Sequence, residues 1–265
     1  MQTFTYQNGT YRTADISPSL LAKFMPSVPF YADILSIVFR ASSKAKRGKY
    51  GDSEWCDSSL ETARALEKVG VTIEVTGMEK LASFSGPCVF IGNHMSTLET
   101  FVLPTIIEPI KNVTFVVKQS LVEYPVFKYV MRTRDPITVG RTNPREDLKA
   151  VFEGGTEKLK SGQSIIVFPQ TTRSRVFEPA EFNTIGVKLA KRAGVPVVPI
   201  ALLTDAWGNG RMLKDFGKID PSKKVHFAFG DAMPIANRGD EEHQKIVEFI
   251  SGKLKEWGGE VKGAI

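Results

Sequence analysis

The chain has 265 residues, of which 42% are hydrophobic and 24% are charged. This balance excludes an intrinsically disordered chain and a collagen-like repeat, and the length allows a large hydrophobic core without disulfides or metals. The 35 Lys and Arg residues outnumber the 29 Asp and Glu residues, which gives a formal net charge of +6. The positive charge favours an anionic partner, either a phosphate compound, a nucleic acid or an acidic lipid.

Cysteine usage and hydropathy limit the cellular setting. The two cysteines, Cys56 and Cys88, form no C-x-x-C pair, so we expect neither a zinc ribbon nor a disulfide framework, and a reducing, cytosolic setting is favoured. The N-terminus has no basic start followed by an apolar stretch, so we expect no secretory signal and a mature chain that starts near Met1. No apolar run reaches the roughly 18 to 20 residues of a membrane-spanning helix, so we expect no single-span anchor.

An apolar region with three prolines opens the chain. Residues 16–41 contain Pro18, Pro26 and Pro29, and because proline breaks a helix interior we predict two short helices rather than one. Apolar side chains recur at helical spacing in the second of them, and the basic run 42–49 follows directly.

This N-terminal region also carries most of the excess positive charge. Residues 1–50 hold seven basic and two acidic residues, which account for +5 of the net +6. An apolar helix that ends in a basic cluster suits an anionic membrane surface. The alternative is a helix pair that packs on the rest of the protein, and the two interpretations are compatible. We therefore treat residues 1–56 as an N-terminal amphipathic helical segment for membrane association.

Beyond this segment, strand-like and helix-like runs alternate. Near-continuous apolar strands separated by helices indicate an α/β fold, with a largely parallel central sheet flanked by helices, in a single domain of residues 57–265. Strands are predicted at 71–75, 87–93, 112–118, 136–140, 164–169, 195–202 and 224–230. Helices are predicted near 57–69, 97–109, 121–132, 146–161, 184–193 and 240–257.

One of the three histidines lies where α/β proteins place their catalytic groups. His94 follows the apolar run 89–92, and the carboxyl ends of parallel strands are the usual place for ligands. His226 lies within a predicted strand and His243 within a charged helix. We expect a structural role for His226 and a solvated surface role for His243.

His94 and Glu99 have a spacing that suits general-base catalysis. Ser96 or Thr97 can cap the helix that follows His94, which puts Glu99 in or near its first turn. From there the carboxylate can reach the imidazole, hold one tautomer and stabilise the protonated ring. The chain has no G-x-S-x-G nucleophile motif, so the pair would activate a hydroxyl supplied by a substrate. The structural alternative is that His94 caps the helix and Glu99 complements its dipole.

Three cations also lie at the ends of predicted strands. Lys118, Arg141 and Arg173 each stand at, or just after, the last residues of a strand. Guanidinium and ammonium groups gathered at the edge where His94 emerges would suit a phosphate. The alternative for any single one of them is a solvated surface charge.

Motifs in the order expected for one family occur between residues 86 and 203. The segment that contains His94 is similar to N-H-x-S-x-x-D, with Glu99 in place of Asp. The Gly-Arg pair at 140–141 looks like the second motif of the same family. With these motifs the chain resembles the glycerolipid acyltransferases typified by 1-acyl-glycerol-3-phosphate acyltransferase.

The third and fourth motifs support the same resemblance. Residues 168–174 are similar to F-P-E-G-T-R-S, with Gln and Thr in place of Glu and Gly, and residues 195–200 resemble the fourth motif. Lys118 matches the Lys of a further segment, K-x-E-L-x-x-x-P. The other residues that the family motifs single out are Asn93, Ser96, Gly140, Phe168, Pro169, Gln170, Thr171, Thr172, Ser174 and Pro199.

The resemblance implies acyl transfer from a thioester, acyl-CoA or acyl carrier protein, to a hydroxyl of 1-acyl-glycerol-3-phosphate or a related lysophospholipid or glycerol phosphate. His94 would be the general base, Glu99 would steady the imidazolium, and Lys118, Arg141 and Arg173 would hold the acceptor phosphate. No cofactor or metal is implied, because the acyl donor is a substrate. The other expected partner is an anionic membrane surface rather than nucleic acid, at the cytoplasmic face of a membrane, with peripheral or monotopic association.

Two other functions stay open from the sequence. One is a non-catalytic, membrane-associated binder of lipid or phosphate that kept the fold and lost turnover. The other is an acyl thioesterase, in which the same base would activate water instead of an acceptor hydroxyl.

Departures from the family motifs carry expectations of their own. Glu99 has one more methylene than Asp, which a backbone or rotamer shift can absorb. Gln170 removes a carboxylate beside Arg173, and we expect this to leave the arginine freer for an anion or to change the acceptor that fits. Thr171 puts a β-branched side chain where glycine allows close backbone approach and positive φ.

Overall fold

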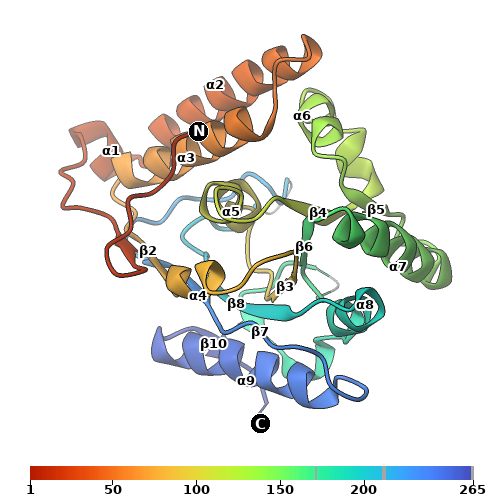
Figure 1. The fold of residues 1–265 in the computed structure, drawn as a ribbon. Coiled ribbons are helices and arrows are strands. Elements are labelled where there is room, and N and C mark those ends of the chain that lie inside the picture. The colour runs from red at the N-terminus through yellow and green to blue at the C-terminus, as the bar shows by residue number, and fades with distance from the viewer. Residues whose placement is uncertain (171, 211–212, 264–265) are drawn as a thin grey trace.

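A computed structural model describes residues 1–170, 172–210 and 213–263, with an eight-stranded sheet at its centre (Figure 1). Its strands are β1 (Tyr11–Arg12), β2 (Ile73–Thr76), β3 (Val89–Gly92), β4 (Val113–Lys118), β5 (Ile137–Val139), β6 (Ser164–Val167), β8 (Val197–Leu203) and β9 (Val225–Phe229). They lie in the order β1-β2-β9-β8-β3-β6-β4-β5. Neighbours are parallel except in the pairs β1–β2 and β8–β9. The predicted α/β fold with a largely parallel sheet is confirmed.

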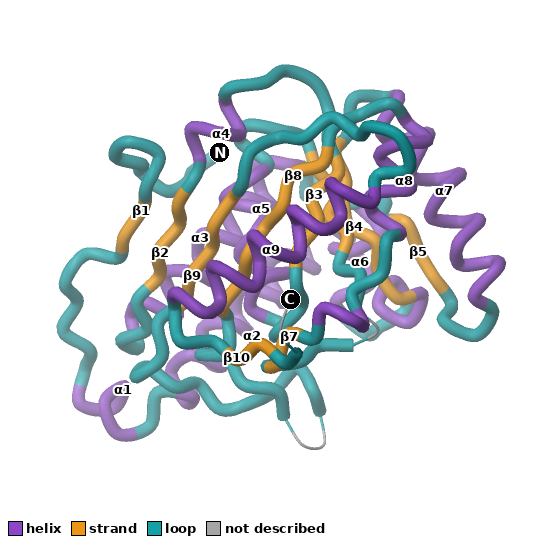
Figure 2. Tube along the Cα trace, turned by 90° about the horizontal axis from the view of Figure 1, so that it is seen from below, coloured by secondary structure: helices purple, strands orange, loops and turns teal. Residues whose placement is uncertain are grey.

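Helices cover both faces of this sheet. On one face lie α2 (Ser27–Lys46), α3 (Asp52–Lys68) and α5 (Leu98–Ile107), and on the other lie α7 (Pro144–Lys160), α8 (Ile185–Ala193) and α9 (Asp240–Glu256). Figure 2 shows α9 running across β8 and β9. The smaller elements are α1 (Leu20–Phe24), α4 (Met78–Ala82), α6 (Phe127–Thr133), the 3-10 turns η1 (Gln119–Val122) and η2 (Pro179–Glu181), and the paired short strands β7 (Val176–Phe177) and β10 (Glu260–Val261).

Alternate side chains of the central strands enter two separate hydrophobic cores. In β3, Phe90 packs in the core beneath α5, whereas Val89 and Ile91 pack in the core beneath α8. Both faces of the strand are therefore buried, which is why its sequence is an unbroken apolar run. Gly186 of α8 permits this close packing, because a Cβ at that position would lie 2.8 Å from the Cδ1 atom of Ile91.

The predicted elements are present with a few differences. All seven predicted strands form, and the short strands β1, β7 and β10 are additional, because two residues carry no periodic pattern. The single helix predicted near 121–132 is wrong. Residues 119–122 form a 3-10 turn, and α6 starts only at Phe127, after Pro125 and after Val126 with its φ of +70°. Proline disfavours helical geometry in the residue before it.

The two predicted N-terminal helices are present as α1 and α2. The basic run does not follow the second helix as expected, because α2 continues through Lys46. Phe30 and Ile34 bury one side of α2 in the core shared with α3. The boundary expected after residue 56 falls inside α3, and β1 pairs with β2 of the main sheet. The N-terminal segment therefore packs as part of the α/β body.

The α1–α2 region also carries exposed apolar side chains. Its exposed side chains are those of Leu20, Leu21, Phe24, Met25, Val28, Leu35 and Phe39. Within the described residues, no helix combines the length and the apolar character needed to cross a bilayer.

Candidate active site

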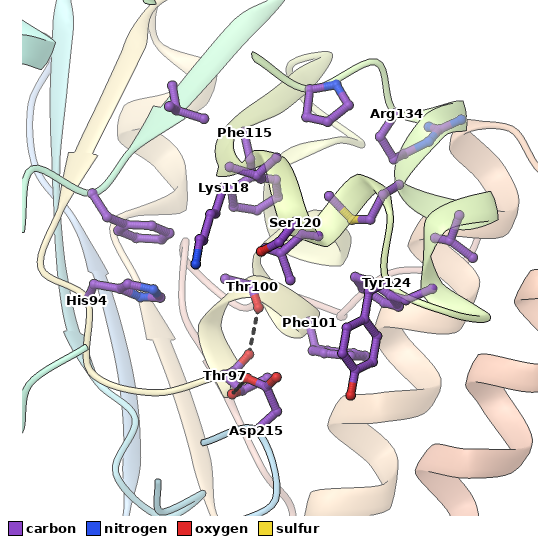
Figure 3. A pocket seen from close by; sticks show the side chains of 18 of the residues that line it. His94, Thr97, Thr100, Phe101, Phe115, Lys118, Ser120, Tyr124, Arg134 and Asp215 are labelled. Carbon is purple, nitrogen blue, oxygen red and sulfur yellow. Dashed lines mark hydrogen bonds between the residues drawn. The ribbon is translucent and has the colours of Figure 1, made fainter. Parts of the chain in front are cut away.

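Four strands end side by side around one cavity. In the sheet β3, β6, β4 and β5 are consecutive and parallel, so their carboxyl ends lie at one edge. His94 follows β3 and Lys118 ends β4. Arg141 follows β5 and Arg173 lies beyond β6. All four side chains line a cavity of about 860 Å³, and Figure 3 shows those of His94 and Lys118 directed into it.

His94 and Glu99 form the predicted contact. The Nδ1 atom of His94 lies 2.9 Å from Oε1 of Glu99. The side chain of His94 is 17% exposed and that of Glu99 is 0% exposed, so the ring borders the cavity while the carboxylate is sealed behind it. Because Glu99 engages Nδ1, Nε2 is the ring atom available to a substrate. The additional methylene of Glu99 is thus accommodated without loss of the contact.

The Glu99 carboxylate is surrounded by hydrogen-bond donors. The backbone N–H groups of Met95 and Ser96 donate to Oε1 at 2.7 and 2.9 Å, and the hydroxyls of Ser96 and Thr204 donate to Oε2 at 3.0 and 2.5 Å. Burial raises the pKa of Glu99, but the hydrogen bond and charge of His94, with the bonds from Thr204 and Ser96, hold it below its usual value. Glu99 is therefore an anion that both satisfies the start of α5 and contacts the imidazole.

Residues after β6 fix the ring and the backbone of His94. Phe168 stacks on the imidazole, with ring centroids 4.5 Å apart and planes inclined by 6°. Gln170 Oε1 accepts a hydrogen bond from the His94 backbone N–H at 2.5 Å, and the Ser174 N–H donates to the His94 carbonyl at 2.9 Å. Residues 168–174 thus hold the His94 ring and backbone in place. The sequence does not predict that Gln170 takes part by accepting from the His94 N–H.

A strained turn presents Arg141. Its φ of +60° is a left-handed conformation that side-chain-bearing residues rarely adopt. Asp147, in the first turn of α7, accepts hydrogen bonds from the N–H groups of Gly140 and Arg141 at 2.7 and 2.8 Å. The side chain of Asn143 caps the same helix. These bonds hold the turn in its unusual shape.

Arg173 is engaged by a carboxylate. Its Nη1 atom lies 2.8 Å from Oδ1 of Asp215 and also donates to the hydroxyl of Thr97. The Thr97 hydroxyl in turn donates to Asp215 Oδ1 at 3.2 Å, and Figure 3 shows these two residues together at the cavity. The expectation that Gln170 leaves Arg173 freer for an anion is therefore wrong, because the segment after β8 supplies another carboxylate.

Other motif residues hold the strand ends together. The Asn93 side chain donates to the Leu202 carbonyl at 2.8 Å and accepts from the Leu202 N–H at 2.9 Å, which ties the end of β3 to β8. The Pro169 carbonyl accepts a hydrogen bond from the side chain of Asn183. These hydrogen bonds shape the loops around the cavity, whose lining includes Pro169 and Asn183.

The remaining motif residues have different positions. The Thr172 hydroxyl lies 3.5 Å from Nζ of Lys214, and both residues line the cavity. Pro199 is buried within β8. Thr171 lies outside the described residues, so the expectation for its β-branched side chain stays a prediction.

The rest of the cavity wall is largely apolar. Side chains from α2, α3, α5, α6 and β4 contribute, among them Ile34, Val38, Trp55, Phe101, Phe115 and Val130. A cavity that joins a histidine and several cations to a long apolar wall suits a ligand with a charged head and a hydrocarbon chain.

The other two histidines have structural surroundings. The His226 ring stacks on Trp257 with centroids 4.8 Å apart, as expected for a structural role. The surface role expected for His243 is wrong, because the ring packs against Phe182, its Nδ1 is buried, and burial lowers its pKa. In the described part of the chain, no three His, Cys, Asp or Glu side chains are grouped to hold a metal ion.

The sequence does not predict three residues of this site. Thr204 directly follows β8. It is therefore a polar residue at the carboxyl end of a strand, the same signal that marks His94 in the sequence. Thr97 is expected only as a helix cap, and it contacts Arg173 instead. Asp215 lies in a long segment without periodic pattern, and no sequence signal marks it.

Comparisons with known proteins agree with the motifs. Residues 72–203 match the family model described as Acyltransferase. The chain is 35% identical over 172 residues to 1-acyl-sn-glycerol-3-phosphate acyltransferase of Pseudomonas aeruginosa, covering 65% of this chain and 62% of that protein. The enzyme of the same name from Saccharomyces cerevisiae is 29% identical over 162 residues, with 58% and 50% covered. The matches thus span less than two thirds of these relatives.

The fold has a solved counterpart. The crystal structure of the 1-acyl-sn-glycerophosphate acyltransferase PlsC from Thermotoga maritima superposes with a TM-score of 0.62, covering 87% of this chain and 93% of that one. The sequence identity is 18%, so this likeness concerns the fold alone. His94, Glu99 and the three strand-end cations all fall within the residues matched by the family model. The chain belongs to the glycerolipid acyltransferase family.

Proposed function

We propose that the protein transfers a fatty acyl group from a thioester to a hydroxyl of 1-acyl-glycerol-3-phosphate or a closely related lysophospholipid. One observation carries this proposal. The His94 ring, backed by the buried Glu99 carboxylate, borders a cavity that is lined by strand-end cations and a long apolar wall. The names of the curated relatives support the same reaction and acceptor.

In the proposed mechanism His94 is a general base. Its Nε2 removes the proton of the acceptor hydroxyl while the oxygen forms a bond to the thioester carbonyl carbon. The C–S bond then breaks, and the sulfur leaves as a thiol with the proton returned by the imidazolium. Glu99 holds the proton on Nδ1 and stabilises the charged ring. A positioned base supplies about 10²- to 10⁴-fold in rate, so orientation and oxyanion stabilisation must supply the rest.

The two parts of the cavity suit the two parts of the substrates. Lys118, Arg141 and Arg173 would hold the acceptor phosphate beside the base, because guanidinium and ammonium groups are strong donors to phosphate oxygens. The apolar wall would receive a hydrocarbon chain. The acyl donor is either acyl-CoA or acyl carrier protein, and both present the same thioester to His94.

The α1–α2 pair would bring the cavity to its lipid substrate. Leu20 and Phe24 are 75% and 81% exposed, and both lie in α1. Lys44 and Lys46 lie in the last turn of α2, whose inner side contributes to the cavity wall. Exposed apolar side chains at one end of α2 and cations at its other end favour an anionic bilayer surface. We therefore propose peripheral association with the cytoplasmic face of a membrane.

One assay separates the proposed reaction from its two alternatives. The purified protein is incubated with labelled acyl-CoA, and in parallel with labelled acyl carrier protein, with and without 1-acyl-glycerol-3-phosphate. We expect thiol release that depends on the acceptor and appears as diacylated product. Release without acceptor would instead identify a thioesterase. Binding of the acceptor without release from either donor would identify a non-catalytic relative, and either result overturns the proposal.

A further inference from the structure

Asp215 reaches the cavity from outside the four motifs. It lies in the long segment between β8 and β9, and its Oδ1 is 2.8 Å from Nη1 of Arg173. Thr97 hydrogen-bonds both partners. The Arg173 side chain is 15% exposed and that of Asp215 is 47% exposed. A half-exposed carboxylate is thus paired with a nearly buried arginine at the place where the proposed acceptor phosphate would bind.

The Asp215 carboxylate occupies the Nη1 donor of Arg173, so that donor is not available to a phosphate. Asp215 also opposes phosphate binding at the other guanidinium donors, because two anions in contact with one arginine repel each other. Resting on the proposed function, we propose that Asp215 is a specificity-determining residue that competes with the acceptor phosphate for Arg173. The competition lowers the preference of the site for phosphate-bearing acceptors over acceptors without phosphate, which do not need Arg173.

The surroundings of Asp215 allow its side chain to move while its backbone stays in place. The Trp207 indole N–H donates to the Asp215 carbonyl at 3.1 Å, and the Trp207 ring packs edge-on against Phe30 of α2 at 4.8 Å. Two residues further on, the Gly217 carbonyl accepts from the Tyr31 hydroxyl at 2.5 Å. Release of Arg173 therefore needs a rotation of the half-exposed carboxylate into solvent, which also breaks its hydrogen bond from the Thr97 hydroxyl.

Lys214, the residue before Asp215, favours replacement of the Asp215 carboxylate by a phosphate at Arg173. Lys214 lines the same cavity, with its Nζ 3.5 Å from the Thr172 hydroxyl. When Asp215 turns away, Arg173 loses its counter-charge and Lys214 remains, so the positive potential at the cavity rises. When the phosphate-bearing product leaves, the carboxylate can return to the guanidinium.

The variant Asp215→Asn tests this competition, because it keeps the shape and removes the charge. We expect the KM for 1-acyl-glycerol-3-phosphate to fall by about two- to fivefold, the range for a partly exposed ion pair. The KM for 1-acylglycerol, which has no phosphate, should not change. The dissociation constant of inorganic phosphate, measured by calorimetry, should fall by the same factor as the first KM.

The matched control is Asp231→Asn, which removes an 80% exposed carboxylate that pairs with Lys80, outside the cavity lining. It should leave all three constants unchanged. Asp215→Ser serves as a second variant if the first has a lowered melting temperature. A higher KM for the phosphate acceptor would show that Asp215 orients Arg173 instead, and unchanged constants would show no competition; either result overturns the inference. The phosphate titration needs no turnover, so it tests the competition even if the proposed acyl transfer is absent.

Discussion

The carboxylate of Glu99 is fully buried and still lies 2.9 Å from Nδ1 of His94, a ring that borders the cavity. The same carboxylate accepts the backbone N–H groups of Met95 and Ser96 at the start of α5. One side chain therefore fixes the geometry of the loop after β3 and the tautomer of the proposed base. This arrangement agrees with the structural interpretation of Glu99, and its catalytic role stays a prediction.

Replacing Glu99 with Gln should lower kcat by about 10²-fold or more, because a neutral amide neither stabilises the imidazolium nor enforces the tautomer with a proton on Nδ1. The KM for the acceptor should change little, because Glu99 does not face the cavity. The conservative variant Glu99→Asp keeps the charge and matches the family residue, so it should retain more activity than Glu99→Gln. Equal activity in Glu99→Gln and the unmodified protein would contradict this role.

Gln170 should act through the backbone of His94 rather than through Arg173. Gln170→Ala removes the acceptor of the His94 N–H, so we expect a drop in kcat of about tenfold and a loss of about 1 kcal/mol in unfolding free energy. Gln170→Glu keeps an acceptor oxygen and restores the family residue. It should remain within a few-fold of the unmodified protein in steady-state kinetics. If Gln170→Ala kept full kcat, the hydrogen bond would have no part in positioning the base.

Glu108 should make the unfolding free energy depend on pH. It follows α5 and accepts hydrogen bonds from Asn112 and from the Val113 N–H, and burial raises its pKa to about 7. The unfolded chain ionises Glu108 near pH 4.5, so from about pH 5 to about pH 8 the folded protein loses stability relative to the unfolded chain. We expect a decrease of about 1 to 2 kcal/mol by urea denaturation at the two pH values.

The variant Glu108→Gln provides the control for this dependence. It has no titrating group at the position, so the difference between the two pH values should shrink by the amount assigned to Glu108. If the variant showed the same pH dependence as the unmodified protein, the raised pKa would be wrong.

The exposed apolar side of α1 should bind anionic bilayers. Replacing Leu20 and Phe24 together with Ser should weaken binding to vesicles containing phosphatidylglycerol by about tenfold or more, because burial of each side chain contributes about 1.5 to 3 kcal/mol. Binding of the unmodified protein should also weaken with salt. In a sedimentation assay the control Leu148→Ser, at a 41% exposed position on α7, should bind normally. Equal binding of all three proteins would argue against this surface.

Local sequence patterns predict the main elements of the fold and the position of His94, the proposed base. Unbroken apolar runs mark strands such as β3 because both of their faces are buried. The strand-end rule places His94, Lys118 and Arg141 at one edge, and the structure brings them to one cavity. The prediction misses strands that are too short to show a periodic apolar pattern, such as β1 and β7. It is also wrong where a proline interrupts the pattern, as before α6.

Contacts between distant segments are what the sequence cannot supply. Asp215 lies 42 residues after Arg173 in a segment with no periodic pattern, and only the fold shows that the two are paired. Gln170 could be compared with the family motif, but its hydrogen bond to the His94 backbone depends on how two loops pack. The contacts of Asp215 and Gln170 therefore follow from the three-dimensional arrangement, although Gln170 lies in a motif that the sequence shows.

In the proposed mechanism Nε2 of His94 removes the proton of the acceptor hydroxyl. The most direct test is the steady-state rate of acyl transfer by His94→Ala, measured with 1-acyl-glycerol-3-phosphate and the donor that the unmodified protein uses. We predict a fall in kcat of about 10²- to 10⁴-fold with an unfolding free energy close to that of the unmodified protein. Full acyl transfer by a folded His94→Ala protein would show that His94 is not the general base.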